Sequence, residues 1–198
     1  GIPAEPLFRS SYYAGIMLSA IISDTVLLRS ATTTQRDVKT ANKLAKIAGV
    51  NLEEYGKLLL TKGTEISDIS DKDLVFQDSK EFGVGDEKIQ ISQINSYNVQ
   101  EPLDRKEGIK KVMREFMEKK KDIVLFVFDI LDIYNMDSYA IVLGPRKKAV
   151  ESAYHVEIGE DDVCFLKKVA SRKKQLYPDI AHRLIDIQKK EKKSKAEN

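Results

Sequence analysis

Six consecutive apolar residues, Ile123 to Phe128, constrain the fold of this chain more than any other feature. A strand that is apolar on both sides must be covered on both sides, so this run predicts a central strand. Further strands are predicted over residues 138–143 and 163–166. Alternating polar and apolar residues predict a hairpin over 80–85 and 88–94. Helical patterns separate these strands, so we expect an α/β fold in which helices cover a mixed sheet.

The first third of the chain predicts three helices with no strand between them. Residues 12–22 form a dense apolar run, which predicts a buried, closely packed helix. Thr34 to Asp37 resembles a capping box that opens a second helix, and Gly49 is its expected stop. Asn51 caps a third helix that ends near Gly63. We interpret these helices as one side of an α/β domain.

A polar stretch near residues 62–70 is the candidate linker. We therefore expect residues 1–62 to be the carboxyl-terminal part of one domain and residues 63–188 to be a second domain. In the second domain, helices are predicted to start at Pro102 and at Pro178. Residues 189–198 are expected to be a disordered charged tail because they are almost entirely polar.

Composition excludes several classes of function. The 33 Lys and Arg residues nearly balance the 31 Asp and Glu residues, whereas a general nucleic-acid binder would be strongly basic. The single cysteine, Cys164, excludes an intramolecular disulfide and fits a reducing compartment. No apolar run is long enough to span a bilayer. We expect a soluble, cytoplasmic protein with neither nucleic acid nor membrane as a partner.

Two stretches carry the candidate chemistry. Ser171-Arg172-Lys173-Lys174-Gln175 places three cations between a strand and a helix that starts with proline, where they can converge on a phosphate or a carboxylate. As loop residues, these cations are expected to lie outside the core. Asp24 ends the apolar run of the first helix, where an aspartate is either a local turn former or a metal ligand. We expect the two stretches to face each other across a cleft.

Other charged residues have simpler interpretations. Asp129 and Asp132 follow the central strand and could bind a metal, but we interpret them as turn residues. His155 and His182 are interpreted as surface or structural histidines. Arg146-Lys147-Lys148 is interpreted as a solvated helix face.

Several motifs follow one another at a specific spacing: Ser23-Asp24-Thr25, Lys80-Glu81-Phe82, Asp129-Ile130-Leu131 and Ser171-Arg172-Lys173-Lys174-Gln175. In this order they resemble family II inorganic pyrophosphatases, the metal-dependent pyrophosphatases of the DHH phosphoesterase superfamily. The resemblance runs from about residue 13 to about residue 184. It implies the helical end of a DHH-type α/β domain followed by the whole second domain.

The resemblance also implies residue roles. Asp24 would be a ligand to one of two active-site metals, and Lys80 would bind the substrate phosphate. Arg172 and Lys173 would be the catalytic cations that clamp phosphate. The implied reaction is hydrolysis of pyrophosphate by water that two metal ions activate, with Mn²⁺ or Co²⁺, or Mg²⁺, as the cofactor.

The chain departs from the family pattern in one respect. It lacks the Asp-His-His motif and the early His-x-x-x-Asp-x-Asp motif, and one carboxylate cannot hold two metal ions. The chain is therefore either part of a longer enzyme, inactive alone, or a truncated relative. The expected partners are pyrophosphate and the missing amino-terminal metal-binding domain, and a homodimer stays open. An exopolyphosphatase of the same superfamily and a non-catalytic phosphate-binding module are the alternatives.

Overall fold

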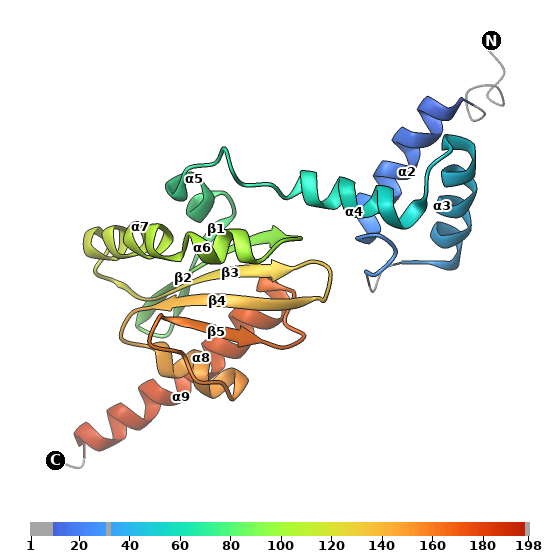
Figure 1. Ribbon diagram of the computed structural model, residues 1–198. Coiled ribbons are helices and arrows are strands. Elements are labelled where there is room, and N and C mark those ends of the chain that lie inside the picture. Colours follow the sequence, from blue (N-terminus) through green and yellow to red (C-terminus); the bar gives the residue numbers. More distant parts are fainter. Residues whose placement is uncertain (1–9, 31–32, 197–198) are drawn as a thin grey trace, which may run out of the picture. The chain divides into compact units, whose positions relative to one another are not determined.

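The chain forms two compact units, Gly1–Glu65 and Ile66–Asn198 (Figure 1). The computed structural model describes residues 10–30 and 33–196. The first unit contains helices α2 (Ser11–Thr25), α3 (Gln35–Ala48) and α4 (Leu52–Gly63). The second unit contains a five-stranded sheet and the remaining helices. The assignment of residues 1–62 and 63–188 to two particular domains stays a prediction.

The helix boundaries in the first unit follow the capping residues of the sequence. The capping box at Thr34 is confirmed, because Asp37 N donates to the Thr34 hydroxyl and Asp37 Oδ2 accepts from Thr34 N at 2.8 Å. Gly49 ends α3 with φ of 72°, in the left-handed region that glycine adopts readily. Asn51 caps α4 by accepting from Glu54 N at 3.1 Å.

Helix α2 differs from the expectation of a buried helix. One face, which includes Ala14, Leu18 and Ile22, is fully buried. The other face is apolar but exposed, because α3 and α4 cover only one side of the helix in the part of the chain that the structure describes. Its exposed residues are Tyr12, Tyr13, Ile16 and Met17, with Tyr12 70% and Ile16 51% exposed.

The second unit is built on a mixed sheet in the order β1-β2-β3-β4-β5. β2 and β3 are parallel and every other neighbouring pair is antiparallel. The predicted α/β class, hairpin and central strand are confirmed. The strand bounds are β1 (Ser79–Val84), β2 (Glu87–Ser96), β3 (Ile123–Asp132), β4 (Asp137–Leu143) and β5 (Val163–Leu166).

Both faces of this sheet are covered by helices (Figure 1). Because side chains alternate along a strand, Leu125 and Val127 pack into one core, whereas Phe126 and Phe128 pack into the other. The first core lies against α8, η1 and α9, and the second lies against α5 and α7. The helix bounds are α5 (Asp71–Phe76), α6 (Gln100–Asp104), α7 (Lys106–Lys119), α8 (Lys147–Tyr154), η1 (Arg172–Leu176) and α9 (Tyr177–Ala196).

The helix expected to start at Pro102 is in fact two helices. Pro102 lies inside the short helix α6. The helix is interrupted at Arg105, and α7 begins at the next residue. The Arg105 side chain reaches the segment before α5, where it donates to Ile66 O and Ile69 O and to Asp71 Oδ1. These contacts join residues more than 30 positions apart, so local sequence does not reveal them.

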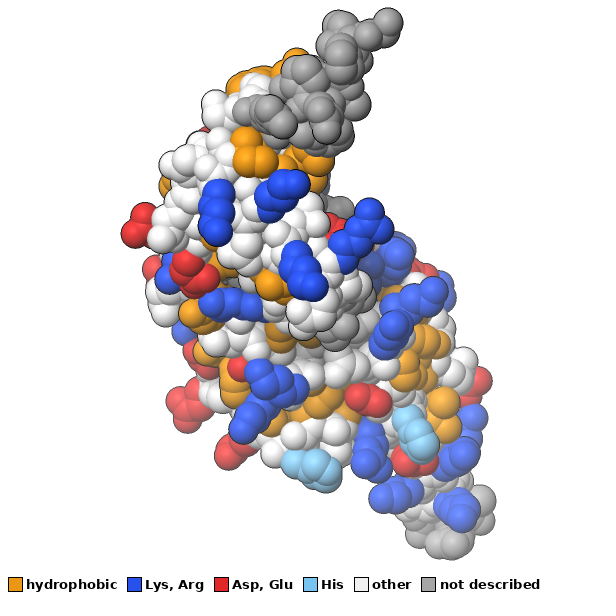
Figure 2. Space-filling view, turned by 90° about the vertical axis from the view of Figure 1, so that its right-hand side faces the viewer, with side chains coloured by type: hydrophobic (Ala, Val, Ile, Leu, Met, Phe, Trp, Pro, Cys, Tyr) orange, Lys and Arg blue, Asp and Glu red, His pale blue; other side chains and the backbone are white. Residues whose placement is uncertain are grey.

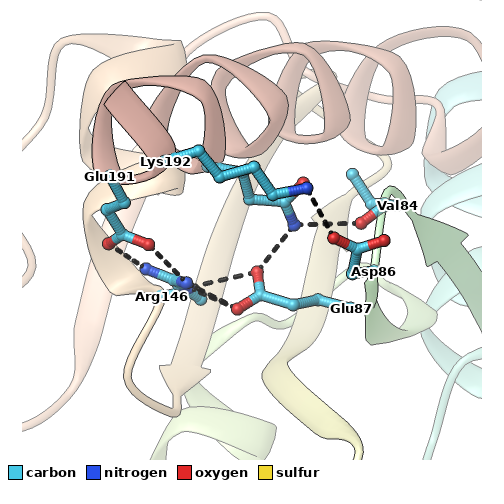
Figure 3. A network of polar contacts seen from close by, with 7 residues as sticks. Val84, Asp86, Glu87, Arg146, Glu191 and Lys192 are labelled. Atoms are coloured by element: carbon cyan, nitrogen blue, oxygen red, sulfur yellow. Dashed lines mark hydrogen bonds and ion pairs between the residues drawn. The ribbon is translucent and has the colours of Figure 1, made fainter. Parts of the chain in front are cut away.

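The prediction of a disordered tail is wrong for the described residues, because α9 continues to Ala196. Figure 3 shows the cause. Arg146 donates to Glu87 and also to Glu191 on α9, with Arg146 Nη1 2.6 Å from Glu191 Oε1. Lys192 Nζ donates to Asp86 Oδ2 at 2.7 Å. The charged end of α9 is thus paired with the β1–β2 turn.

We predict that Arg146→Ala lowers the free energy of unfolding by about 2 kcal/mol, because Glu87, only 18% exposed, loses its charged partner. Arg114→Ala is the matched control, since Arg114 is 52% exposed and makes one long ion pair. Denaturant unfolding followed by circular dichroism measures both. Equal, small losses in the two variants would show that the paired network does not stabilise the unit.

Candidate functional site

The three consecutive cations lie in a single π-helical turn, η1, that runs directly into α9. The sequence predicted a loop here. The turn forms because Ser171 Oγ accepts from Lys174 N at 3.2 Å at its start. Its end is anchored by Leu176, which is fully buried. The backbone that carries the cations is therefore fixed at both ends.

Gln175 ties this turn to the chain that precedes it. Its Oε1 accepts from Ala170 N at 2.9 Å and from Ser171 N at 3.1 Å. Its Nε2 donates to Lys168 O at 2.9 Å. One side chain thus bonds three backbone groups, which orders the segment from Lys168 to Gln175.

Arg172 joins the turn to Asp78, the residue directly before the first strand. Arg172 Nη1 donates to Asp78 O at 2.6 Å, and Nη2 donates to Asp78 Oδ1 at 2.8 Å. Arg172 is 8% exposed, unlike the exposed loop cation that the sequence predicted. A guanidinium is seldom buried without a partner, and Asp78 supplies both a carboxylate and a carbonyl oxygen.

Lys80 lies on the face of β1 that meets the turn. Side chains two apart on a strand share a face, so Lys80 and Phe82 point the same way. Asp78, which binds Arg172, comes just before the first residue of this strand. Phe82 stacks on Tyr177, which directly follows η1, with ring centroids 4.2 Å apart. The structure therefore brings Lys80 to the same face as the Arg172 turn.

Two of the predicted site cations, Lys80 and Lys173, are available to a ligand. Both are exposed, and neither makes a hydrogen bond or ion pair with a residue that the structure describes. Arg172 has five N–H donors, of which Asp78 accepts two. The arrangement can therefore hold an anion with several oxygen atoms.

Asp24 belongs to the first unit, whereas Lys80, Arg172 and Lys173 belong to the second. It is exposed at the end of α2 and makes no hydrogen bond or ion pair with a described residue. The backbone immediately after it is unusual. Val26, Leu27 and Leu28 all have positive φ, between 48° and 63°, which bulky side chains rarely adopt.

Close packing holds this left-handed turn after Asp24. The Thr25 hydroxyl donates to Ile21 O and accepts from Leu28 N at 3.0 Å. Leu27 is buried against Gly56, where an added Cβ would lie 2.2 Å from Leu27 Cδ1. The position of Asp24 is thus fixed by contacts between α2 and α4.

Asp129 and Asp132 have different environments. Asp132 is a turn residue as expected, since it accepts from Tyr134 N at 2.8 Å and from Asn135 N at 3.0 Å. The turn interpretation is wrong for Asp129, which lies inside β3 with none of its surface exposed. Burial raises the pKa of Asp129 to about 7.

The two histidines lie at the surface of the second unit, on the face shown in Figure 2. His155 ends α8, and His182 is 78% exposed on α9. A surface hollow of about 340 Å³ contains none of the predicted site residues. It is lined by Ser152, His155, Arg183, Asp186, Ile187 and Lys190.

In residues 10–30 and 33–196, no three His, Cys, Asp or Glu side chains are grouped so that they could hold a metal ion. Asp24 alone cannot build a two-metal centre. No helix in the same described ranges is both long and apolar enough to cross a bilayer.

Sequence reasoning missed the role of two residues in the second unit. Asp78, the partner of Arg172, lies 94 positions away from it in the chain. Asp78 lies just before β1, and no local sequence signal connects it with Arg172. Gln175 belongs to the recognised motif, but its function as a brace depends on backbone groups that fold back on it.

The chain is similar to a set of known proteins over most of its length. A family profile described as "DHHA2 domain" matches residues 57–182. Curated relatives named "Probable manganese-dependent inorganic pyrophosphatase" include one from Brevibacillus brevis, 47% identical over 165 residues. Another, from Staphylococcus aureus, is 43% identical over 171 residues. These matches confirm the resemblance that the motifs indicated.

The matches cover 83% and 86% of this chain but only 53% and 55% of the two relatives. The chain therefore spans about half the length of the curated relatives it matches. A crystal structure from Methanococcus jannaschii, described as a "putative family II inorganic pyrophosphatase", matches with a TM-score of 0.64 and 36% identity. That match covers 88% of this chain and 56% of the other.

We predict that Gln175→Ala loosens the turn, because the backbone N–H groups of Ala170 and Ser171 and the carbonyl of Lys168 lose their hydrogen-bond partner. Hydrogen exchange followed by NMR should show at least tenfold lower protection of the Ala170 and Ser171 amides. Lys174→Ala, which removes an exposed side chain from the same turn, is the control and should leave protection unchanged. Unchanged protection in Gln175→Ala would mean that the turn is held by other contacts.

Proposed function

The chain belongs to the DHHA2 domain family, and on that premise we propose that it is the carboxyl-terminal part of a manganese-dependent inorganic pyrophosphatase. Within that enzyme it binds the phosphate groups of pyrophosphate. The observation that carries the proposal is the Arg172 turn, which is bonded to Asp78 at the start of the strand that carries Lys80. We also propose that the enzyme acts in the cytoplasm, where a free buried cysteine such as Cys164 is stable.

The cations match the charge of the substrate. Pyrophosphate carries several negative charges that repel an attacking hydroxide until they are neutralised. Lys173 and Lys80 supply mobile point charges, and Arg172 supplies a rigid, planar set of donors. Because Asp78 holds the guanidinium in place, Arg172 does not need to reorganise when phosphate binds.

The residues that the structure describes do not form a complete metal centre. Asp24 is the proposed ligand from the first unit, and the described residues contain no group of three ligands. We infer that the other ligands come from an amino-terminal part like the one present in the longer relatives. The names of the relatives support Mn²⁺ as the metal, with Co²⁺ or Mg²⁺ as alternatives.

The exposed apolar face of α2 supports the same inference. Helix α2, which carries Asp24 near its end, presents an exposed hydrophobic surface formed by Tyr12, Tyr13, Ile16 and Met17. Such a surface is typical of one that another part of a protein covers. We propose that the amino-terminal part covers it and adds its metal ligands to Asp24.

The test uses a fusion protein. The part of the Brevibacillus relative that this chain does not match is joined to the amino terminus of this chain. We expect manganese-dependent release of phosphate from pyrophosphate, with slower release from polyphosphate, and none from this chain alone. Lys173→Ala in the fusion should lower kcat/KM at least tenfold, because a charged contact to phosphate is lost. Lys174→Ala is the matched control. An inactive but folded fusion that binds manganese would contradict the proposed activity, and faster release from polyphosphate would indicate an exopolyphosphatase.

We predict that Asp24→Asn in the same fusion lowers manganese affinity at least tenfold without changing the unfolding temperature. The expected stability follows from the side chain, which is exposed and has no partner among the described residues. Metal content after dialysis is the measurement, and Asp68→Asn, another exposed aspartate, is the control. Normal manganese content in Asp24→Asn would show that Asp24 is not a ligand.

A further inference from the structure

Asp129 is a carboxyl group inside the sheet with an incomplete set of partners. It lies in the middle of β3 and has no exposed surface. Its Oδ2 accepts from Gln93 Nε2 at 2.7 Å on the neighbouring strand β2. Its Oδ1 is buried and has no hydrogen-bond partner among the described residues. A buried carboxylate oxygen without a donor is costly, so the protein needs another way to satisfy it.

The neighbour best placed to satisfy Oδ1 is Ser138 on β4. Asp129 shares its sheet face with Val127, and Ser138 shares the same face with Ala140. The Ser138 hydroxyl is close enough to the Asp129 carboxyl to lower the pKa of that carboxyl, although burial has the larger, opposite effect. However, Ser138 Oγ donates its proton to Val169 O at 2.8 Å. The Ser138 hydroxyl therefore has no proton left to donate to Asp129. Its oxygen can still accept a hydrogen bond.

A protonated Asp129 resolves this shortage of donors. Its own O–H can donate to Ser138 Oγ, while Ser138 donates to Val169 O and Gln93 donates to Asp129 Oδ2. The resulting chain of hydrogen bonds runs from β2 through β3 and β4 to Val169. Val169 precedes Arg172 by only three residues.

We propose that Asp129 is a positioning residue for the turn that carries Arg172 and Lys173, acting through Ser138 and Val169. The proposal deepens the proposed function, because it makes Asp129 a support for the phosphate-binding cations. Asp129 itself is buried behind the turn and touches no substrate. Its effect on the order of the turn does not depend on which anion the turn binds.

Asp129 has several charged and titratable neighbours, and it is the carboxyl group whose protonation changes near neutral pH. The neighbours are Arg172 from η1, Cys164 from β5 and Tyr154 from α8, whose hydroxyl faces Asp179 of α9. Burial raises the pKa of Cys164 to about 12 and also raises the pKa of Tyr154. Burial raises the pKa of Asp129 to about 7.

The direction of the effect follows from this pKa. The folded protein holds the Asp129 proton more tightly than the unfolded chain, whose aspartate pKa is 3.8. The stabilisation is complete below about pH 4 and is lost as the pH rises to about 7. Once ionised, Asp129 Oδ1 competes for the Ser138 proton, and the bond from Ser138 to Val169 O weakens. The turn is then less well ordered.

The first test measures the protonation of Asp129 directly. The ¹³Cγ resonance of Asp129 in this chain should titrate near pH 7, well above an exposed control such as Asp86. A midpoint near 4 would overturn the proposal, because Asp129 would then be ionised in the folded protein and could not donate to Ser138.

The second test follows the turn. Protection of the Ala170 and Ser171 amides from hydrogen exchange, corrected for intrinsic rates, should fall at least fivefold between pH 6 and pH 8. In Asp129→Asn the fall should disappear, because the amide donates to Ser138 at every pH. Asp86→Asn is the matched control and should behave as the wild type.

Protection that does not change with pH in the wild type, or that falls equally in Asp129→Asn, would overturn the proposal. If Asp129→Asn fails to fold, the ¹³Cγ titration and the wild-type exchange profile still decide it. Neither measurement uses pyrophosphate, so a failure of the proposed enzymatic activity would leave these results intact and distinguishable.

Discussion

The contact between Arg172 and Asp78 determines where the proposed phosphate-binding cations lie. It joins the turn before the last helix to the residue that directly precedes the first strand of the sheet, with nitrogen–oxygen distances of 2.6 and 2.8 Å. Lys80 is the second residue of that strand, so the same contact holds the start of the strand that carries Lys80 next to the turn. Phe82 and Tyr177 reinforce this alignment by stacking at 4.2 Å. The price of burying a guanidinium is offset because Asp78 offers two acceptors.

Local sequence was sufficient for much of the fold and insufficient for the contacts between distant segments. The apolar run at Ile123 to Phe128 predicted the central strand, and Thr34 and Asn51 marked helix starts, because these signals act within a few residues. The break at Arg105 and the ordered end of α9 depend on partners far away in the chain. For the site, the motif predicted Lys80, Arg172 and Lys173, but neither the pairing of Arg172 with Asp78 nor the burial of Asp129 could be predicted.

Two features of the first unit have a common explanation. Helix α2 exposes an apolar face that includes Tyr12 and Ile16, and Asp24 near its end belongs to no group of three His, Cys, Asp or Glu among the described residues. The amino-terminal domain that we propose would cover the apolar face and add metal ligands to Asp24. The length of the relatives, of which this chain spans about half, is consistent with such a domain. The strained turn from Val26 to Leu28 fixes Asp24 in advance of that assembly.

The most direct test of the account is NMR mapping of pyrophosphate binding to this chain without added metal. We expect the largest amide shift changes at Lys80, Arg172 and Lys173, because these residues form the proposed phosphate site. Changes centred on His155, Arg183 and Lys190, which line the surface hollow between α8 and α9, would contradict it. In that case the Arg172 turn would be a structural element of the second unit, and phosphate recognition would belong to another surface.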